Sequence, residues 1–104
     1  MSRQPERLSI EVIEDPLHRA ALYRELRQPQ ADWIPHDIKV DERLMAELIA
    51  YRRYKTAQLK WAILVICGLD DPRGELTPGE TIMLPPITWI RDRLHHYAKL
   101  GLEV

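Results

Sequence analysis

The first third of the chain shows two different spacings of apolar residues. Apolar and polar residues alternate from Leu8 to Val12, which is the period of two that predicts a short strand. Asp15 followed by Pro16 combines an N-cap residue with a first-turn proline, so it predicts the start of a helix. We expect Pro29 to end this helix. Its apolar stripe consists of Leu17, Ala21, Leu22 and Leu26.

The next segment, from Trp33 to Val40, has the pattern of an extended chain. Pro35 indicates an edge strand, because proline has no N–H to donate to a neighbouring strand. Asp41 is the expected N-cap of a second helix. The inward-facing candidates of the extended segment are Ile34, Ile38 and Val40. The apolar positions of the second helix are Leu44, Leu48, Ile49 and Tyr51.

A third helix is predicted from Ala57 to Cys67, with Thr56 as its cap and Gly68 as its stop. This segment is apolar almost all round, which is typical of a helix buried on most sides. A strand is the alternative for Ile63–Cys67, because β-branched residues are dense there. Two turns follow, at residues 70–74 and 77–80, and the residues Thr81–Leu84 have the pattern of a short strand.

The chain ends in a predicted helix that Thr88 caps and Gly101 closes, with its stripe at Ile90, Leu94, Tyr97 and Ala98. The resulting order is strand–helix, then strand–helix–helix–strand, then helix. This order predicts an α+β fold. It has an N-terminal strand and helix over residues 1–31, a β-α-α-β unit over residues 32–86 and a C-terminal helix over residues 87–104.

Composition limits the class of protein. The 104 residues fit one domain with a modest core. A net charge of −1 argues against an electrostatic nucleic-acid binder, and one cysteine excludes an internal disulfide framework. The longest apolar stretch, Leu59–Leu69, contains Lys60 and has about half of the roughly 20 residues of a membrane span. No apolar signal-peptide segment follows Met1–Glu6, so we expect a soluble protein of a reducing compartment.

The reactive side chains suggest no enzyme. His95 and His96 are adjacent on a helix and point about 100° apart, so they cannot hold one metal ion together. His18 and His36 have no ligand spacing, and Cys67 at the end of an apolar run is expected to be a small buried hydrophobe. The acidic residues of the 70–80 loop do not follow a calcium-binding spacing. We therefore expect no catalytic residue, metal or cofactor.

The sequence favours binding to other proteins over catalysis. Large aromatic residues such as Trp33 and Trp89 are frequent interface anchors, although they are equally suited to fill the core of a chain without phenylalanine. Arg52 and Arg53 lie beside tyrosines, which favours a small nucleic-acid patch, but an exposed helix edge is the simpler interpretation. The partner-binding candidates are Trp33, Trp89, Arg91, Tyr97, Arg52 and Arg53.

The middle unit resembles a LysM domain. The similar segments are Ile38-Lys39-Val40, Asp41, Leu48-Ile49-Ala50-Tyr51, Leu59–Cys67, Leu76-Thr77-Pro78-Gly79-Glu80 and Thr81–Pro85. A narrower similarity is to LysM-like wedge proteins in the baseplates of phages and related contractile machines. It consists of Leu59–Ile66, with its early Leu-Lys-Trp, and of Leu69-Asp70-Asp71-Pro72. The chain departs from the LysM pattern at Cys67, where asparagine is usual, and at Val40-Asp41 in place of Gly-Asp.

This resemblance implies two helices packed on one side of a two-stranded antiparallel sheet. It also implies a non-enzymatic structural part of a phage tail or baseplate, assembled in the host cytoplasm and docked to other tail proteins in the virion. The flanking segments at residues 8–28 and 88–100 would make those contacts. The alternatives are a peptidoglycan-binding LysM module and a small nucleic-acid-binding regulatory protein.

Overall fold

Short helices and one small sheet make up the part of the chain that the structure, a computed structural model, describes: residues 8–68 and 75–102. This content confirms the predicted α+β class. In chain order the elements are the 3₁₀ turn η1 (Ile10–Val12), helix α1 (Pro16–Leu26), strand β1 (Ile34–Asp37), the 3₁₀ turn η2 (Val40–Glu42), helix α2 (Ala46–Tyr54), the 3₁₀ turn η3 (Ala57–Leu59), helix α3 (Lys60–Ile66), strand β2 (Thr81–Leu84) and helix α4 (Ile87–Leu102).

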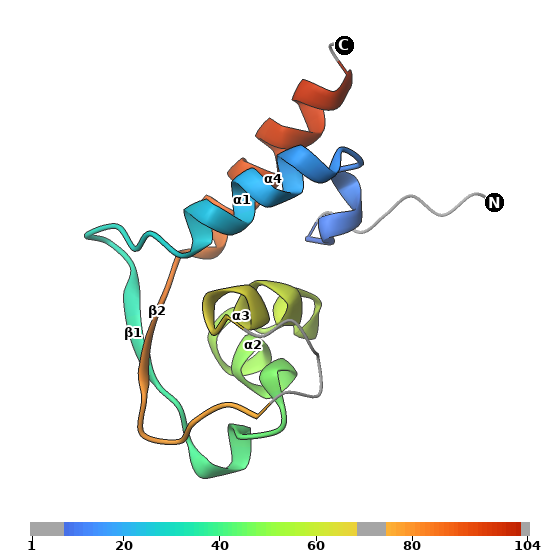
Figure 1. The fold of residues 1–104 in the computed structure, drawn as a ribbon. Coiled ribbons are helices and arrows are strands. Elements are labelled where there is room, and N and C mark those ends of the chain that lie inside the picture. The colour runs from blue at the N-terminus through green and yellow to red at the C-terminus, as the bar shows by residue number, and fades with distance from the viewer. Residues whose placement is uncertain (1–7, 69–74, 103–104) are drawn as a thin grey trace, which may run out of the picture.

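The sheet consists of β1 and β2, which pair antiparallel with Ile34 opposite Leu84. The pairing extends past the strands, because the amide of Ile38 donates to the Glu80 carbonyl at 2.9 Å and its carbonyl accepts from Gly79. Gly79 has a φ of 93°, which the predicted turn at residues 77–80 requires of its third residue. Helices α2 and α3 both lie beside the sheet, as Figure 1 shows.

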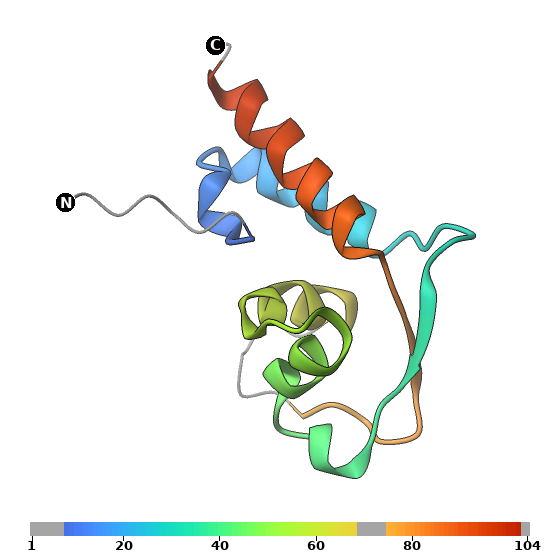
Figure 2. The same cartoon turned by 180° about the vertical axis from the view of Figure 1, so that it is seen from behind.

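Helices α1 and α4 form a second layer, side by side in Figures 1 and 2. They run antiparallel, and Arg93 of α4 pairs with Glu25 of α1 at 2.9 Å. The N-terminal segment is attached to α3, because the Trp61 indole donates to the Leu8 carbonyl at 2.8 Å. One apolar core joins the two layers, and its fully buried members include Ile13, Leu22, Ile49, Leu59, Ile63, Ile90 and Leu94.

The predicted strand at Leu8–Val12 is wrong, because the structure has the 3₁₀ turn η1 there. The Ser9 side chain accepts from the Glu11 amide and begins the turn, and the Leu8 carbonyl is occupied by Trp61. A period of two over five residues is too short to define a strand when no neighbouring strand is available. Helix α1 also ends at Leu26, before Pro29.

The corner between β1 and α2 also differs from the prediction. Ile38 is buried as expected, but Val40 is 79% exposed and Ile34 is 54% exposed. The alternation breaks after Ile38 because the chain enters the 3₁₀ turn η2. Asp41 lies inside that turn and is not the cap of α2, which begins at Ala46. Of the apolar positions predicted for the second helix, Ile49 is buried, Tyr51 is exposed, and Leu44 is exposed and precedes α2.

Several local signals are confirmed. The Asp15 side chain caps α1 by accepting from the Leu17 amide at 2.8 Å, and Thr56 caps η3, which continues into α3. Residues 63–66 are helical, so the strand alternative is wrong. Thr88 is not the cap of α4, which begins at Ile87 and runs past Gly101 to Leu102. The predicted turn at residues 70–74 lies outside the described residues.

Helix α2 ends at a residue whose backbone favours glycine. Lys55 has a φ of 63°, in the left-handed region where a side chain is strained. We expect Lys55→Gly to raise the free energy of unfolding by about 0.5–1 kcal/mol, because glycine relieves that strain. The measurement is urea denaturation, with Arg91→Gly at an exposed position of α4 as the control that should lose about 1 kcal/mol. A loss of stability in Lys55→Gly would contradict the left-handed cap.

Candidate docking surface

A buried carboxylate lies at the corner where β1 turns toward α2. Glu42 is 0% exposed, and three groups donate to its oxygens. The Lys39 amide at 2.8 Å and the His36 Nε2 at 2.9 Å share Oε1, and the Arg52 Nη1 reaches Oε2 at 2.8 Å. These donors come from three parts of the fold: the end of β1, the residue before η2 and helix α2. Glu42 therefore ties the sheet to the helix.

The hydrogen bonds also fix the tautomer of His36, which is 4% exposed. The Arg53 Nε lies 2.7 Å from Nδ1 of His36. Because a guanidinium nitrogen can only donate, Nδ1 must accept, and the imidazole proton is on Nε2. That proton points at Glu42. His36 thus links Arg53 to the buried carboxylate of Glu42 through two hydrogen bonds, one at each ring nitrogen.

Arg52 closes the cluster on its exposed side. Its guanidinium donates to both carboxylate oxygens of Asp41, at 3.1 and 2.6 Å, as well as to Glu42. The Arg52 hydrogen bond holds the pKa of Asp41 below its ordinary value. The two carboxylates in turn raise the pKa of Arg52, with Asp41 contributing most. Burial opposes ionisation of Glu42, but the bonds from Lys39, His36 and Arg52 together lower its pKa.

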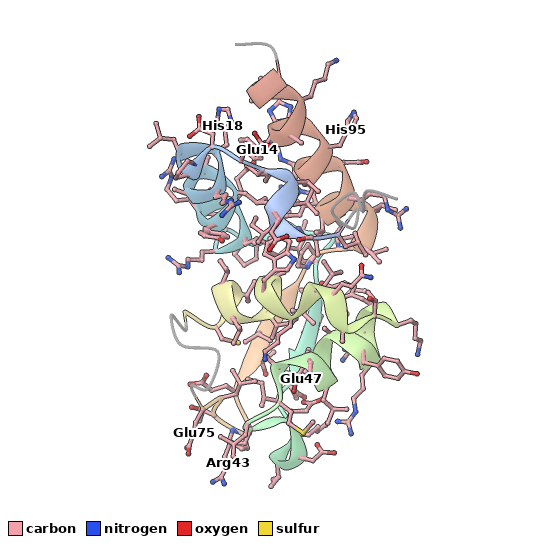
Figure 3. All side chains as sticks on the ribbon, turned by 90° about the vertical axis from the view of Figure 1, so that its right-hand side faces the viewer. Glu14, His18, Arg43, Glu47, Glu75 and His95 are labelled. Carbon is pink, nitrogen blue, oxygen red and sulfur yellow. The ribbon has the colours of Figure 1, made fainter. Side chains whose placement is uncertain are left out.

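An exposed apolar surface lies directly beside this cluster. Val40 belongs to η2, and Leu44 and Met45 follow it with exposed fractions of 54% and 44%. We call these three residues the apolar corner. Leu44 lies four residues after Val40, in the turn between η2 and α2. In Figure 3, Arg43 marks this end of the molecule, opposite the end where His18 and His95 lie.

The corner is also attached to the segment before β2. The Leu76 amide donates to the Arg43 carbonyl at 2.7 Å, and Leu76 itself is buried. Two separate connections, one through Glu42 and one through Leu76, therefore hold the backbone that carries these exposed side chains. Exposed apolar groups on a fixed backbone are the features of a docking surface.

The predicted partner-binding residues do not gather on one surface. Arg52 and Arg53 belong to the Glu42 cluster. Trp33 is 3% exposed, and its ring packs edge-on against Trp89 with centroids 5.1 Å apart, so Trp33 offers almost no surface to a partner. Trp89 is half-buried. Arg91 is exposed on α4 and lines a groove with Val12 and His95.

Tyr97 is held inside the chain by the second helix layer. Its hydroxyl donates to Glu25 of α1, and Arg93 lies over its ring with 5.0 Å between the guanidinium carbon and the centroid. Burial, followed by the negative Glu25, raises the pKa of Tyr97. The residue therefore joins α1 to α4 instead of presenting a ring to a partner.

Sequence reasoning missed the two central residues of the cluster. His36 has the same parity as Ile34 and Ile38, so the strand pattern itself placed it on the inner face, where an imidazole needs partners. Glu42 carries no comparable signal, because an acidic residue near a helix start is usually a solvated cap. Its burial depends on His36 and Arg52, which are distant in sequence.

Other reactive groups remain isolated in the described ranges. No group of three or more His, Cys, Asp or Glu residues there is arranged to hold a metal ion. Over the same residues, no helix has both the length and the apolar character needed to cross a membrane. Cys67 is half-buried, and burial together with the charge of Glu80 raises its pKa to about 11. Comparison with known proteins finds no match for this chain among protein families, curated proteins or solved structures.

Replacing Glu42 tests how much the buried carboxylate contributes to the stability of the fold. We expect Glu42→Gln to lower the free energy of unfolding at pH 7 by about 2–4 kcal/mol, because the amide removes the charge while its donors stay buried. Glu47→Gln is the matched control, since Glu47 makes a half-exposed ion pair with Lys60 at 3.4 Å and should lose at most about 1 kcal/mol. Equal losses in the two variants would contradict a special role for Glu42.

The same pair of proteins tests the protonation state of Glu42. The folded-state pKa of Glu42 lies below the ordinary 4.5, so its stabilising effect is complete above that pH and is lost as the pH falls through the folded value. The stability difference between wild type and Glu42→Gln should therefore shrink below about pH 4.5 in denaturation series. A difference that stays constant into the acid range would mean that folding leaves the pKa of Glu42 unchanged.

The thiol provides a separate test of burial at the end of α3. A pKa of about 11, against an ordinary 9.0, makes the thiolate roughly 100-fold rarer. We expect Ellman's reagent to modify Cys67 about two orders of magnitude more slowly in the native protein than in the guanidinium-unfolded chain. Equal rates would show that the Cys67 side chain is not shielded.

Proposed function

We propose that this protein is a non-enzymatic structural component of a phage tail or related contractile machine, in which a LysM-like β-α-α-β core docks onto other baseplate proteins. The order β1–α2–α3–β2 supports this proposal. So does the placement of both helices beside an antiparallel two-stranded sheet (Figure 1), which is the arrangement that the sequence resemblance implies. The protein would act in the virion after assembly in the host cytoplasm.

The apolar corner is the observation that carries the proposal. Val40, Leu44 and Met45 lie close together in the chain, and Val40 is 79% exposed and Leu44 54% exposed on a backbone held by Glu42. Covering these side chains by a partner removes apolar surface from water without any change in the fold. The corner therefore suits a permanent contact in an assembly.

We infer a bracing role for the flanking segments, in place of the docking role that the sequence suggested. Helices α1 and α4 pack on each other through Glu25, Arg93 and Tyr97, so their inner faces are already used. These two helices would brace the core and leave the docking contact to the apolar corner, so the exposed Leu17 of α1 lies outside that contact. Adhesion through fixed surfaces, with no chemical step, is the mechanism that we propose.

The arginine pair gives little support to nucleic-acid binding. Arg52 is neutralised by Asp41 and Glu42, so its charge is already satisfied within the chain. Of the two arginines, Arg53 has no ion pair within the described residues, and one such cation in a nearly neutral protein provides weak attraction to phosphates.

Co-expression with the products of the neighbouring genes tests the docking function. We expect native mass spectrometry to find the full chain in a complex with a sheath, tube or spike protein. The double variant Val40→Asp, Leu44→Asp should weaken that complex by about ten-fold or more, because charges would replace the buried apolar contacts. Leu17→Asp, an equally exposed aliphatic residue on α1, is the matched control.

Three results would contradict the proposal. The first is a stable wild-type monomer that captures none of the tail proteins. The second is binding to insoluble peptidoglycan or a salt-dependent shift of labelled DNA without any tail-protein complex, which would favour one of the other two functions. The third, a Leu17→Asp variant as damaging as the double variant, would remove the apolar corner as the contact.

A further inference from the structure

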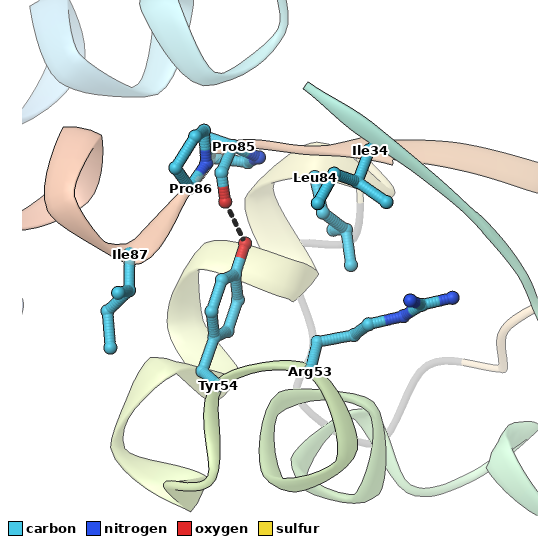
Figure 4. A pocket seen from close by; sticks show the side chains of 7 residues that line it. All are labelled: Ile34, Arg53, Tyr54, Leu84, Pro85, Pro86 and Ile87. Atoms are coloured by element: carbon cyan, nitrogen blue, oxygen red, sulfur yellow. Dashed lines mark hydrogen bonds between the residues drawn. The ribbon is translucent and has the colours of Figure 1, made fainter. Parts of the chain in front are cut away.

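A small notch opens at the upper end of the sheet, away from the apolar corner. It encloses about 190 Å³ and lies where β1 and β2 meet the end of α2 and the start of α4. Figure 4 shows Arg53 and Tyr54 on the α2 side, facing Ile34, Leu84 and Pro85. Cavities of about 150 Å³ hold one benzene ring, so this notch has room for one branched or aromatic side chain.

The walls of the notch are apolar and fixed. Leu84 is 2% exposed, and the Pro85-Pro86 pair has restricted backbone angles. The Tyr54 hydroxyl donates to the Pro85 carbonyl at 2.7 Å, so these two polar groups satisfy each other. The notch is therefore formed before anything enters it, which lowers the entropy cost of binding.

The rim adds the cation of Arg53, which pairs with no carboxylate in the described part of the chain. Arg53 donates through Nε to the neutral His36 and, at a long 3.5 Å, through Nη2 to the Pro35 carbonyl. Among the residues that the structure describes, no carboxylate makes an ion pair with Arg53, whereas the adjacent Arg52 has two. Ile34 on the same rim is 54% exposed. The notch thus combines an apolar floor with a positive charge at its rim.

We propose that this notch is a docking pocket for a segment of a partner protein that presents one apolar side chain next to a carboxylate. The apolar side chain would occupy the space between Ile34, Leu84 and Ile87. The carboxylate would accept from the outer guanidinium nitrogens of Arg53. His36 holds Arg53 in place, so the Glu42 cluster positions this second contact too. The identity of the partner rests on the proposed docking function, but the chemistry of the pocket does not.

Two capped dipeptides test the pocket on the isotope-labelled full chain. Acetyl-Leu-Glu-amide, at millimolar concentration, should shift the methyl signals of Ile34 and Ile87 saturably. Acetyl-Leu-Gln-amide should bind about three-fold more weakly, which is the usual gain from an exposed ion pair. Arg53→Gln should abolish this preference, Arg53→Lys should keep part of it, and Arg91→Gln on α4 should leave it unchanged.

Two outcomes would overturn the inference: no saturable shift of the notch signals, or equal affinity for the two dipeptides in the wild type. If the dipeptides fail to bind while the native complex still forms, the pocket is wrong and the docking function stands. If the dipeptides bind selectively but no complex with a tail protein forms, the pocket is supported and the proposed docking function is contradicted.

Discussion

The corner between β1 and α2 depends on one constraint, the burial of the Glu42 carboxylate among its hydrogen-bond donors. A carboxylate without solvent is strongly unfavourable unless its oxygens find donors. Here the donors are a backbone amide, His36 and Arg52, which come from different elements. The chain can therefore bury Glu42 only when β1, η2 and α2 are correctly placed, and this requirement selects one geometry for a corner that has little apolar packing of its own.

Both proposed contact sites follow from that geometry. On one side of the cluster, η2 carries Val40 outward because the turn that buries Glu42 breaks the strand alternation. On the other side, His36 accepts from Arg53 and directs its guanidinium to the rim of the notch. One polar network thus fixes an apolar surface and a cationic rim at separate places. Such preorganisation suits a protein that acts by adhesion, because little flexibility is lost when a partner binds.

The sequence predicted features that depend on a few adjacent residues. The Asp15 and Thr56 caps, the Gly79 turn and the buried stripe of α4 follow from local hydrogen bonding and periodicity, and the structure confirms them. The predictions from the sequence were wrong where contacts between residues far apart in the chain determine the local structure. Leu8–Val12 forms a turn bonded to Trp61, and Asp41 binds Arg52 instead of capping α2. His36 was detectable from strand parity, but Glu42 and the apolar corner depend on partners that no local pattern reveals.

The protonation of this cluster is open to direct observation. We would follow the carboxyl carbon of Glu42 by ¹³C NMR through an acid titration and read the His36 tautomer from ¹⁵N couplings in the same sample. The structure predicts a Glu42 midpoint below 4.5, with the His36 proton on Nε2 and a bare, accepting Nδ1. A Glu42 midpoint at or above 4.5, or a proton on Nδ1 of neutral His36, would contradict the network that holds the corner.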